Sequence, residues 1–211
     1  AYNIEVLQNK HGVFIMEHLA VVADTVQKII DIELTWKIDE TGKIIASMEA
    51  QKDEEFPDLP RFGIRLFLDK KFEDVAYYGM GPHESYRDKH QATSHGIYRS
   101  KVTDLHEDYI RPQENGSHYD CDYVELTNAQ YGFAIVSEDS FSFNASYYTQ
   151  EVLEQTEHNF ELEESDSTVL CVDYALNGIG SNSCGPVVLD QYRFRENEFR
   201  FQLKLVTYVK R

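Results

Sequence analysis

The chain has 211 residues, of which 42% are hydrophobic and 27% are charged, enough for one large domain or two small ones with a substantial core. Its 37 acidic residues outnumber the 20 Lys and Arg residues and give a formal net charge of -17. This charge opposes nucleic-acid phosphates and anionic lipid surfaces, and no apolar run approaches the roughly 20 residues that cross a bilayer. We therefore expect a soluble protein with neither nucleic acid nor a membrane as its partner.

Cysteine usage indicates a reducing compartment. Cys121, Cys171 and Cys184 are far apart and odd in number, unlike the dense, even set of a disulfide-stapled module, so we expect a cytoplasmic location. Cys121 and Cys171 lie in strand-like runs, where small buried apolar groups are expected. The chain begins Ala-Tyr-Asn, without an initiator Met or a signal segment, so we expect residue 1 to be a truncation or processing boundary.

Strand patterns dominate the chain. Apolar residues alternate with polar ones over 30–38 and 44–50, and the turn-forming residues 39–42 lie between them, so these segments predict a hairpin followed by a polar loop at 51–60. Thr149 is predicted to cap a short helix. Further strands are expected at 62–68, 140–148, 168–174 and 198–209. The patterns together predict an all-β fold, a large antiparallel sandwich or barrel built from residues 1–211 as a single domain.

Residues 75–120 interrupt the strand rhythm and are predicted to form a long insertion with a functional or interfacial role. They contain several glycines and prolines and five of the eight histidines. Imidazole is a common metal ligand, but the spacing contains neither a His-x-x-x-His pair nor a Cys-x-x-Cys pair, so we predict no metal site. The histidines concerned are His83, His90, His95, His106 and His118.

Most local signatures of catalysis are missing. Retaining glycosidases need two carboxylates roughly 5–5.5 Å apart, and spacing alone singles out no such pair among the acidic residues. A Gly-x-Ser-x-Gly elbow and a phosphate-binding Gly-x-x-x-x-Gly-Lys loop are also absent from the sequence. Residues 178–186 (Gly-Ile-Gly-Ser-Asn-Ser-Cys-Gly-Pro) combine turn residues with groups that suit sugar hydroxyls, although composition alone favours a structural turn.

Four ordered motifs carry a resemblance to a known family. They are residues 60–63 (Pro-Arg-Phe-Gly), 78–89 (Tyr-Gly-Met-Gly-Pro-His-Glu-Ser-Tyr-Arg-Asp-Lys), 112–116 (Pro-Gln-Glu-Asn-Gly) and 178–186. In order and spacing the chain resembles the C-terminal small-chain domain, domain 5, of glycoside hydrolase family 2 β-galactosidases. The resemblance implies a two-layer antiparallel supersandwich, also seen in galactose mutarotases, that forms a C-terminal fragment of a longer enzyme. It also implies that the catalytic glutamates lie in a separate (β/α)₈ barrel, so this chain alone should not hydrolyse lactose.

The resemblance further implies a substrate-pocket loop on the aglycone side of the active site. In well-known members this loop carries a Trp on which a sugar stacks. Cys184 stands at that position here and offers less apolar surface, while Asn182 and Ser183 remain candidate hydroxyl partners. The implied partners are the remaining domains or large subunit of a β-galactosidase and a galactoside at the interdomain pocket. No cofactor is expected within this chain, and any need for Mg²⁺ or Na⁺ rests with the parent enzyme.

The chain departs from the family pattern at several positions. Arg87 stands where the family has a Pro and Lys89 where it has an Arg, and we expect these turn residues to order their loop. No counterpart of the family's opening tryptophan-containing segment precedes residue 60. For residues 112–116 we expect a turn in which Glu114 and Asn115 bond to nearby backbone groups, with a contact to a neighbouring domain as the alternative.

Other functions stay open beside the accessory-domain interpretation, which predicts a large exposed apolar patch on the domain alone. An aldose 1-epimerase-like enzyme on the same fold would use His158 and Glu114 as acid and base, with Arg61 and Asp173 holding the substrate. Otherwise His158 is expected to be buried, and Asp173 would need a partner if buried. A separately encoded small subunit is a further alternative. A carbohydrate-binding module would need an exposed aromatic platform, whereas Trp36, the only Trp, is expected in the core.

Overall fold

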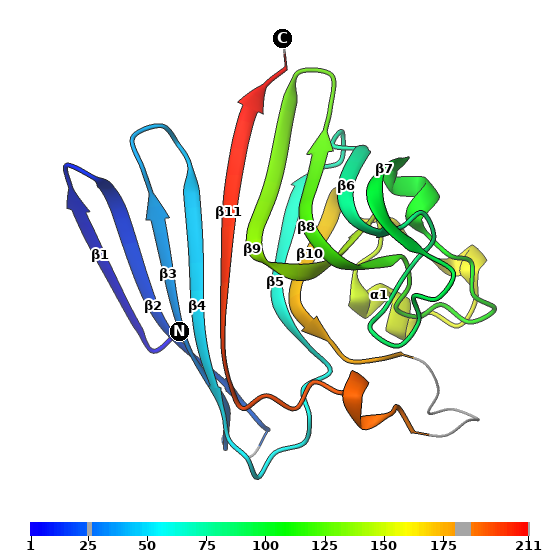
Figure 1. Cartoon of the computed structure of the whole chain (residues 1–211), viewed down its shortest axis with the longest axis horizontal. Helices are drawn as coiled ribbons and strands as arrows, with labels where there is room; N and C mark the ends of the chain where they lie inside the picture. The colour runs from blue at the N-terminus through cyan, green and yellow to red at the C-terminus, as the bar shows by residue number, and fades with distance from the viewer. Residues whose placement is uncertain (25–26, 180–186, 211) are drawn as a thin grey trace.

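Alternation of apolar and polar side chains builds antiparallel strands along nearly the whole chain (Figure 1). The computed structural model describes residues 1–24, 27–179 and 187–210. The helical elements are α1 (Gln150–Gln155) and the 3₁₀ turns η1 (Val102–Leu105), η2 (Asn159–Glu161) and η3 (Asp190–Tyr192). The strands are β1 (Asn3–Asn9), β2 (Gly12–Val22), β3 (Lys28–Ile38), β4 (Ile44–Lys52), β5 (Arg61–Asp69), β6 (Asp74–Gly81), β7 (Ser94–Lys101), β8 (Ser117–Thr127), β9 (Tyr131–Ser146), β10 (Ser167–Leu176) and β11 (Glu198–Val209).

One long strand joins the two layers. The described strands follow the order β1-β2-β3-β4-β11-β9-β8-β6-β7, and β10 lies between β9 and β5. The first part of the 16-residue β9 pairs with β11 and its last part with β10. Strands β1 to β4 and β11 therefore form one layer, on the left in Figure 1, and β5 and β10 belong to the other. The predicted all-β class, a two-layer antiparallel sheet with few short helices, is confirmed.

The local predictions for the hairpin and the helix are also confirmed. Strands β3 and β4 pair with Ile38 opposite Ile44, and Asp39 Oδ1 accepts the backbone N–H groups of Thr41 and Lys43 in the connecting turn. The Thr149 hydroxyl accepts the N–H of Val152 at 3.3 Å and caps α1. The turn at Asp39 and the helix start at Thr149 form for the same reason: a short side chain places its oxygen beside backbone N–H groups that have no other acceptor.

The prediction that residues 75–120 form an irregular insertion was wrong, because this range holds most of β6, all of β7 and the start of β8. Glycine often weakens a strand interior, and the prediction depended on that tendency. In the structure, glycines occupy strand positions where a neighbour fills the side-chain space. A Cβ at Gly79 would overlap Cys121 Sγ, and a Cβ at Gly81 would overlap the Tyr77 hydroxyl.

Gly79→Ala is expected to destabilise the chain by about 1–3 kcal/mol, since the added methyl group meets the buried Cys121 side chain and backbone. Gly96→Ala is the matched control. Gly96 lies directly opposite Gly79 in the β6–β7 ladder, but its Cβ would first meet the movable Tyr98 hydroxyl at 3.3 Å. Urea unfolding of both variants measures the difference, and equal losses would contradict this account.

The core lies between the two layers and contains Cys121, as predicted. Cys171 is also buried, 3% exposed. Trp36 packs against the main core, and its indole N–H donates to Glu17 Oε1 at 2.9 Å. This position confirms the expected core role of Trp36. No helix among the described residues is long and apolar enough to cross a membrane.

Candidate functional site

A cavity of about 640 Å³ lies where β5 begins and β10 ends. Antiparallel pairing places Arg61, the first residue of β5, opposite Leu176, the last residue of β10, and both line the cavity. Residues 111–114, two side chains of the α1 helix and the segment 177–179 complete the lining. The cavity is therefore lined by parts of three of the four sequence motifs, at residues 60–63, 112–116 and 178–186.

An arginine between two carboxylates borders this cavity. Arg61 Nη2 lies 2.6 Å from Asp173 Oδ2, Arg61 Nε lies 3.2 Å from Asp173 Oδ1, and Arg61 Nη1 lies 3.0 Å from Glu114 Oε2. Burial raises the pKa of Asp173 and of Glu114, and the guanidinium opposes that rise in both carboxyls. Asp173 thus has the partner that its burial requires, and Arg61 is held in place from both sides.

Gly63, in the motif at residues 60–63, leaves the space that the Asp173 carboxylate of this ion-pair cluster occupies. Gly63 lies opposite Asp173 in the β5–β10 ladder, and a Cβ at Gly63 would lie 2.7 Å from Asp173 Oδ1 and 2.6 Å from its Cα. Any larger side chain would displace the carboxylate that Arg61 binds. The Pro60 carbonyl also accepts the N–H of Asn177 at 2.8 Å, which ties this motif to the segment that follows β10.

The motif at residues 78–89 binds the backbone at the start of the motif at residues 178–186. Asp88 Oδ1 accepts the N–H of Ile179 at 3.3 Å, and a Cβ at Gly178 would lie 2.6 Å from the Asp88 carboxylate. Two backbone hydrogen bonds between Tyr86 and Lys89, of 2.8 and 2.9 Å, close the turn that presents Asp88. The turn residues therefore order their own loop and position the backbone at 178–179.

Glu84 connects the second motif to the third, a role that the sequence analysis missed. Its side chain is buried and accepts Lys89 Nζ, the Tyr109 hydroxyl and the Gly116 N–H, the last at 2.8 Å. Burial alone would raise the pKa of Glu84, but these donors outweigh it and lower that pKa. An acidic residue inside a glycine- and proline-rich motif, followed five positions later by Lys89, was the available signal.

The expectation for Glu114 and Asn115 was half right. Asn115 bonds to the backbone, accepting the Glu107 N–H at 3.0 Å and donating to the Gln113 carbonyl at 2.9 Å. Glu114 bonds instead to the Arg61 side chain, because the turn directs it toward β5, which is distant in sequence but adjacent in space. Gly116 closes the turn with a φ of 68°, the left-handed region that favours glycine.

The epimerase residues are only partly brought together. Arg61, Glu114 and Asp173 meet, but His158 is not among the residues that line the cavity. His158 is exposed, not buried as expected, with 56% of its side chain accessible; it stacks on Phe160 and bonds to Glu161 across the short turn η2. Local capping of η2 by the His158 side chain explains this position. In the described structure His158 and Glu114 are therefore not brought together as an acid–base pair.

The implied substrate residues Asn182, Ser183 and Cys184 lie outside the described residues. The chain is described up to Ile179 on one side of them and from Val187 on the other. Within residues 1–24, 27–179 and 187–210, no three His, Cys, Asp or Glu side chains are grouped to hold a metal ion.

Fold and cavity together define a two-layer β-sandwich domain with a pocket at one end. The family model described as Beta galactosidase small chain matches residues 2–205. This chain belongs to the β-galactosidase small-chain family.

Relatives of the chain are much longer than the chain itself. It is 42% identical over 206 residues to a β-galactosidase of Actinobacillus pleuropneumoniae, covering 98% of this chain and 20% of the relative. It is 39% identical to a β-galactosidase of Staphylococcus xylosus, covering 97% of this chain and 21% of the relative. The chain thus spans about one fifth of these relatives. Among solved structures it is similar to a GalM/aldose epimerase homologue from C. elegans, with a TM-score of 0.43, 10% identity and coverage of 98% of this chain and 68% of that one.

Proposed function

We propose that this chain is the accessory small-chain domain of a cytoplasmic glycoside hydrolase family 2 β-galactosidase that hydrolyses terminal β-galactosides such as lactose. In this role the 178–186 loop contributes Asn182, Ser183 and Cys184 to the substrate pocket, and the domain surface contacts the rest of the enzyme. The observation that carries the proposal is the meeting of three of the four motifs around one cavity, with Asp88 of the remaining motif bonded to the backbone where the loop begins.

The buried carboxylates of the cavity favour a catalytic pair elsewhere in the enzyme. Asp173 is 2% exposed, binds Arg61 through both oxygens and is not among the residues that line the cavity, so an incoming sugar would not reach it. Glu114 uses one oxygen on the same guanidinium. A glycosidase needs one carboxyl to deliver a proton and another to attack or activate water. These contacts support structural roles for Asp173 and Glu114 in this domain.

A chimera tests the proposal directly. The matching 206 residues of the Actinobacillus pleuropneumoniae β-galactosidase are replaced by this chain, and hydrolysis of a chromogenic β-galactoside is measured. We expect hydrolysis by the chimera and none by the host enzyme without this region. Adding the 211-residue chain in trans to the shortened host tests the separate-subunit arrangement. An inactive chimera would reject the proposed function.

Loop variants of the active chimera test the substrate role. Asn182→Ala and Ser183→Ala are each expected to raise KM about fivefold, because each loses one hydrogen bond to a sugar hydroxyl, about 1 kcal/mol. The chain alone should neither hydrolyse the galactoside nor accelerate mutarotation of α-galactose. Mutarotation that is lost on His158→Ala would instead establish the epimerase function.

A further inference from the structure

The layer formed by β1 to β4 and β11 carries an apolar face that the other layer covers only in part. Pairing places Val6 opposite Ile15 and Ile15 opposite Trp36, so these side chains share the face that continues into the core. Ile4 and Val21 lie on the same face by the same register. Glu17 also lies on this face and accepts the Trp36 indole N–H. We call its apolar members the β1–β2 inner face: Ile4, Val6, Val13, Ile15, Leu19 and Val21.

Exposure rises steadily along this face toward the edge of the sheet. Ala46 on β4 is fully buried and Leu34 on β3 is 9% exposed. Ile15 on β2 is half-buried, and Val6 on β1 is 62% exposed. Ile4 and Val21 are 57% and 49% exposed. Apolar side chains that continue a core face normally lie against another layer, so this face lacks part of its covering.

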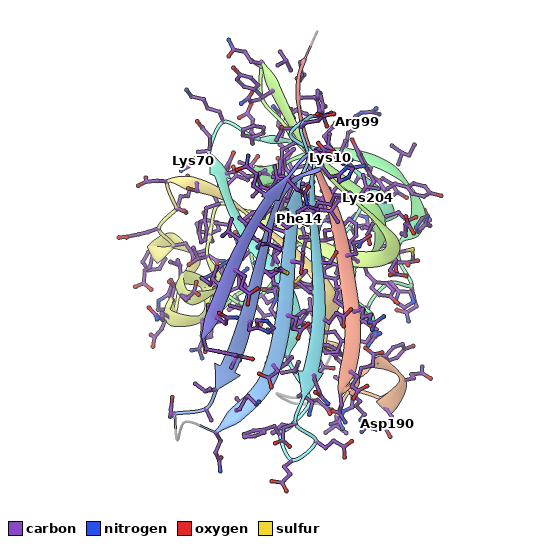
Figure 2. All side chains as sticks on the ribbon, turned by 90° about the vertical axis from the view of Figure 1, so that its left-hand side faces the viewer. Lys10, Phe14, Lys70, Arg99, Asp190 and Lys204 are labelled. Atoms are coloured by element: carbon purple, nitrogen blue, oxygen red, sulfur yellow. The ribbon has the colours of Figure 1, made fainter. Side chains whose placement is uncertain are left out.

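The facing layer stops at β5. The core-facing residues of β5 are only half-buried, whereas those of the neighbouring β10 are buried. Among the described residues β5 pairs with β10 alone, which leaves its other edge without a strand. In Figure 1 the β1–β2 hairpin lies at the left edge of the molecule and β5 lies near its centre, and in Figure 2 the layer that contains the hairpin is nearest the viewer. The half-buried β5 side chains are Phe62, Ile64, Leu66 and Leu68.

We propose that an extended polypeptide segment adds to the free edge of β5 and places alternate apolar side chains on the β1–β2 inner face. The segment comes from the part of the β-galactosidase polypeptide that lies outside these 211 residues. The inference rests on the proposed function and names the partner of the domain surface. It is strand addition, in which backbone hydrogen bonds supply affinity and every second side chain supplies the packing.

The β5 edge favours a strand as the occupant. β5 is nine residues long and contains no proline, and the only register shift in its ladder lies on the β10 side, between Asp173 and Ala175. Exposed edges of this kind pair readily unless a proline, a bulge or a covering segment protects them. A strand satisfies the unpaired backbone groups of β5 and covers apolar side chains in the same step.

The net charge of this chain and the greater length of its relatives favour the rest of the enzyme, over a second copy of this chain, as the source of the added strand. Each copy carries a net charge of -17, so two copies repel one another on approach. About four fifths of each relative lies outside the matched region, since the match covers 20% and 21% of the two relatives. The same polypeptide supplies its segments at high effective concentration, without the entropy loss of a second binding event.

Hydrogen exchange on the chain and on the chimera tests the β5 contact. In the 211-residue chain the β5 amides that point away from β10 are expected to exchange rapidly. In the chimera with the Actinobacillus pleuropneumoniae host, the same amides are expected to be protected at least about tenfold. Rapid exchange of these amides in a chimera that hydrolyses its substrate would overturn the inference and leave the proposed function standing.

Two neighbouring residues of β1 provide matched variants for the inner face. Val6 lies on the inner face, and Leu7 lies on the opposite face of the same strand with a similar exposure of 56%. Val6→Lys and Leu7→Lys should each shift the Tm of the chain alone by less than about 2 °C, since both side chains are already exposed. In the chimera only Val6→Lys should lower the Tm, by about 5 °C or more. Equal shifts for the two chimeras would overturn the inference.

Two other outcomes are also decisive. A chain that forms a dimer in sedimentation, and becomes monomeric with Val6→Lys but not with Leu7→Lys, would show that a second copy covers the face and would overturn our choice of occupant. An unmodified chimera that neither folds nor hydrolyses the galactoside would reject the proposed function, and the inference with it. An active chimera with an unprotected β5 edge rejects the inference alone.

Discussion

Arg61→Met is expected to destabilise the chain by about 3–5 kcal/mol at neutral pH, because removing one member of a buried ion-pair cluster leaves the others uncompensated. Arg61 is the cation bound to both Asp173 and Glu114, and Asp173 is 2% exposed. Methionine keeps much of the side-chain volume but provides neither the charge nor the donors. Urea unfolding at pH 7 measures the loss.

The loss of stability caused by Arg61→Met should become smaller as the pH falls. Burial already raises the pKa of both carboxyls in the folded chain, and removing the guanidinium raises each pKa further. A carboxyl with a raised folded-state pKa stabilises the fold below its ordinary pKa, and this stability is lost as the pH rises through the folded value. The difference between wild type and Arg61→Met is therefore largest near pH 7 and smaller at about pH 4.

Arg195→Met is the control for the Arg61 variant. Arg195 also pairs with two carboxylates, Asp58 and Asp190, but about half of its side chain is exposed, so solvent screens both pairs. Its replacement should change the free energy of unfolding by less than about 1 kcal/mol. Similar losses for the two variants at pH 7 would show that burial of the Arg61 cluster has no special effect.

Acidification from pH 6.5 to pH 4 is expected to remove about 3 kcal/mol of stability through His118 alone. This imidazole is 1% exposed and lies against the rings of Tyr77 and Phe143. Burial lowers the pKa of His118 from 6.5 to about 4, although the Met80 carbonyl at Nδ1 opposes that shift. The folded chain thus holds the neutral ring, and its contribution is complete above pH 6.5 and lost as the pH falls toward 4.

His118→Asn removes this titration while keeping an N–H donor for the Met80 carbonyl. Because carboxyl groups titrate over the same range, the quantity to measure is the stability difference between wild type and variant at each pH. This difference should fall by about 3 kcal/mol between pH 7 and pH 4. A constant difference for His118→Asn would contradict the account.

Prediction from sequence succeeded where a pattern depends on near neighbours. Alternation identified the β3–β4 hairpin, and a single hydroxyl identified the start of α1 at Thr149. It failed at β6 and β7, where glycines occupy ordinary strand positions because side chains such as Cys121 fill their space from another strand. Residues 3–22, which form β1 and β2, were assigned no element, since their apolar runs do not alternate strictly with polar residues.

Patterns within the sequence sufficed for the all-β class, for the buried Cys121, for Trp36 packed against the core, and for four motifs that identify the small-chain family. The contacts that those motifs make became visible only in the folded chain. Arg61, Glu114 and Asp173 lie up to 112 positions apart, and their pairing depends on the register between β5 and β10 and on a turn that approaches from elsewhere. Local propensity acts over a few residues, whereas an ion-pair cluster and a free strand edge depend on which distant segments become neighbours when the sheet closes.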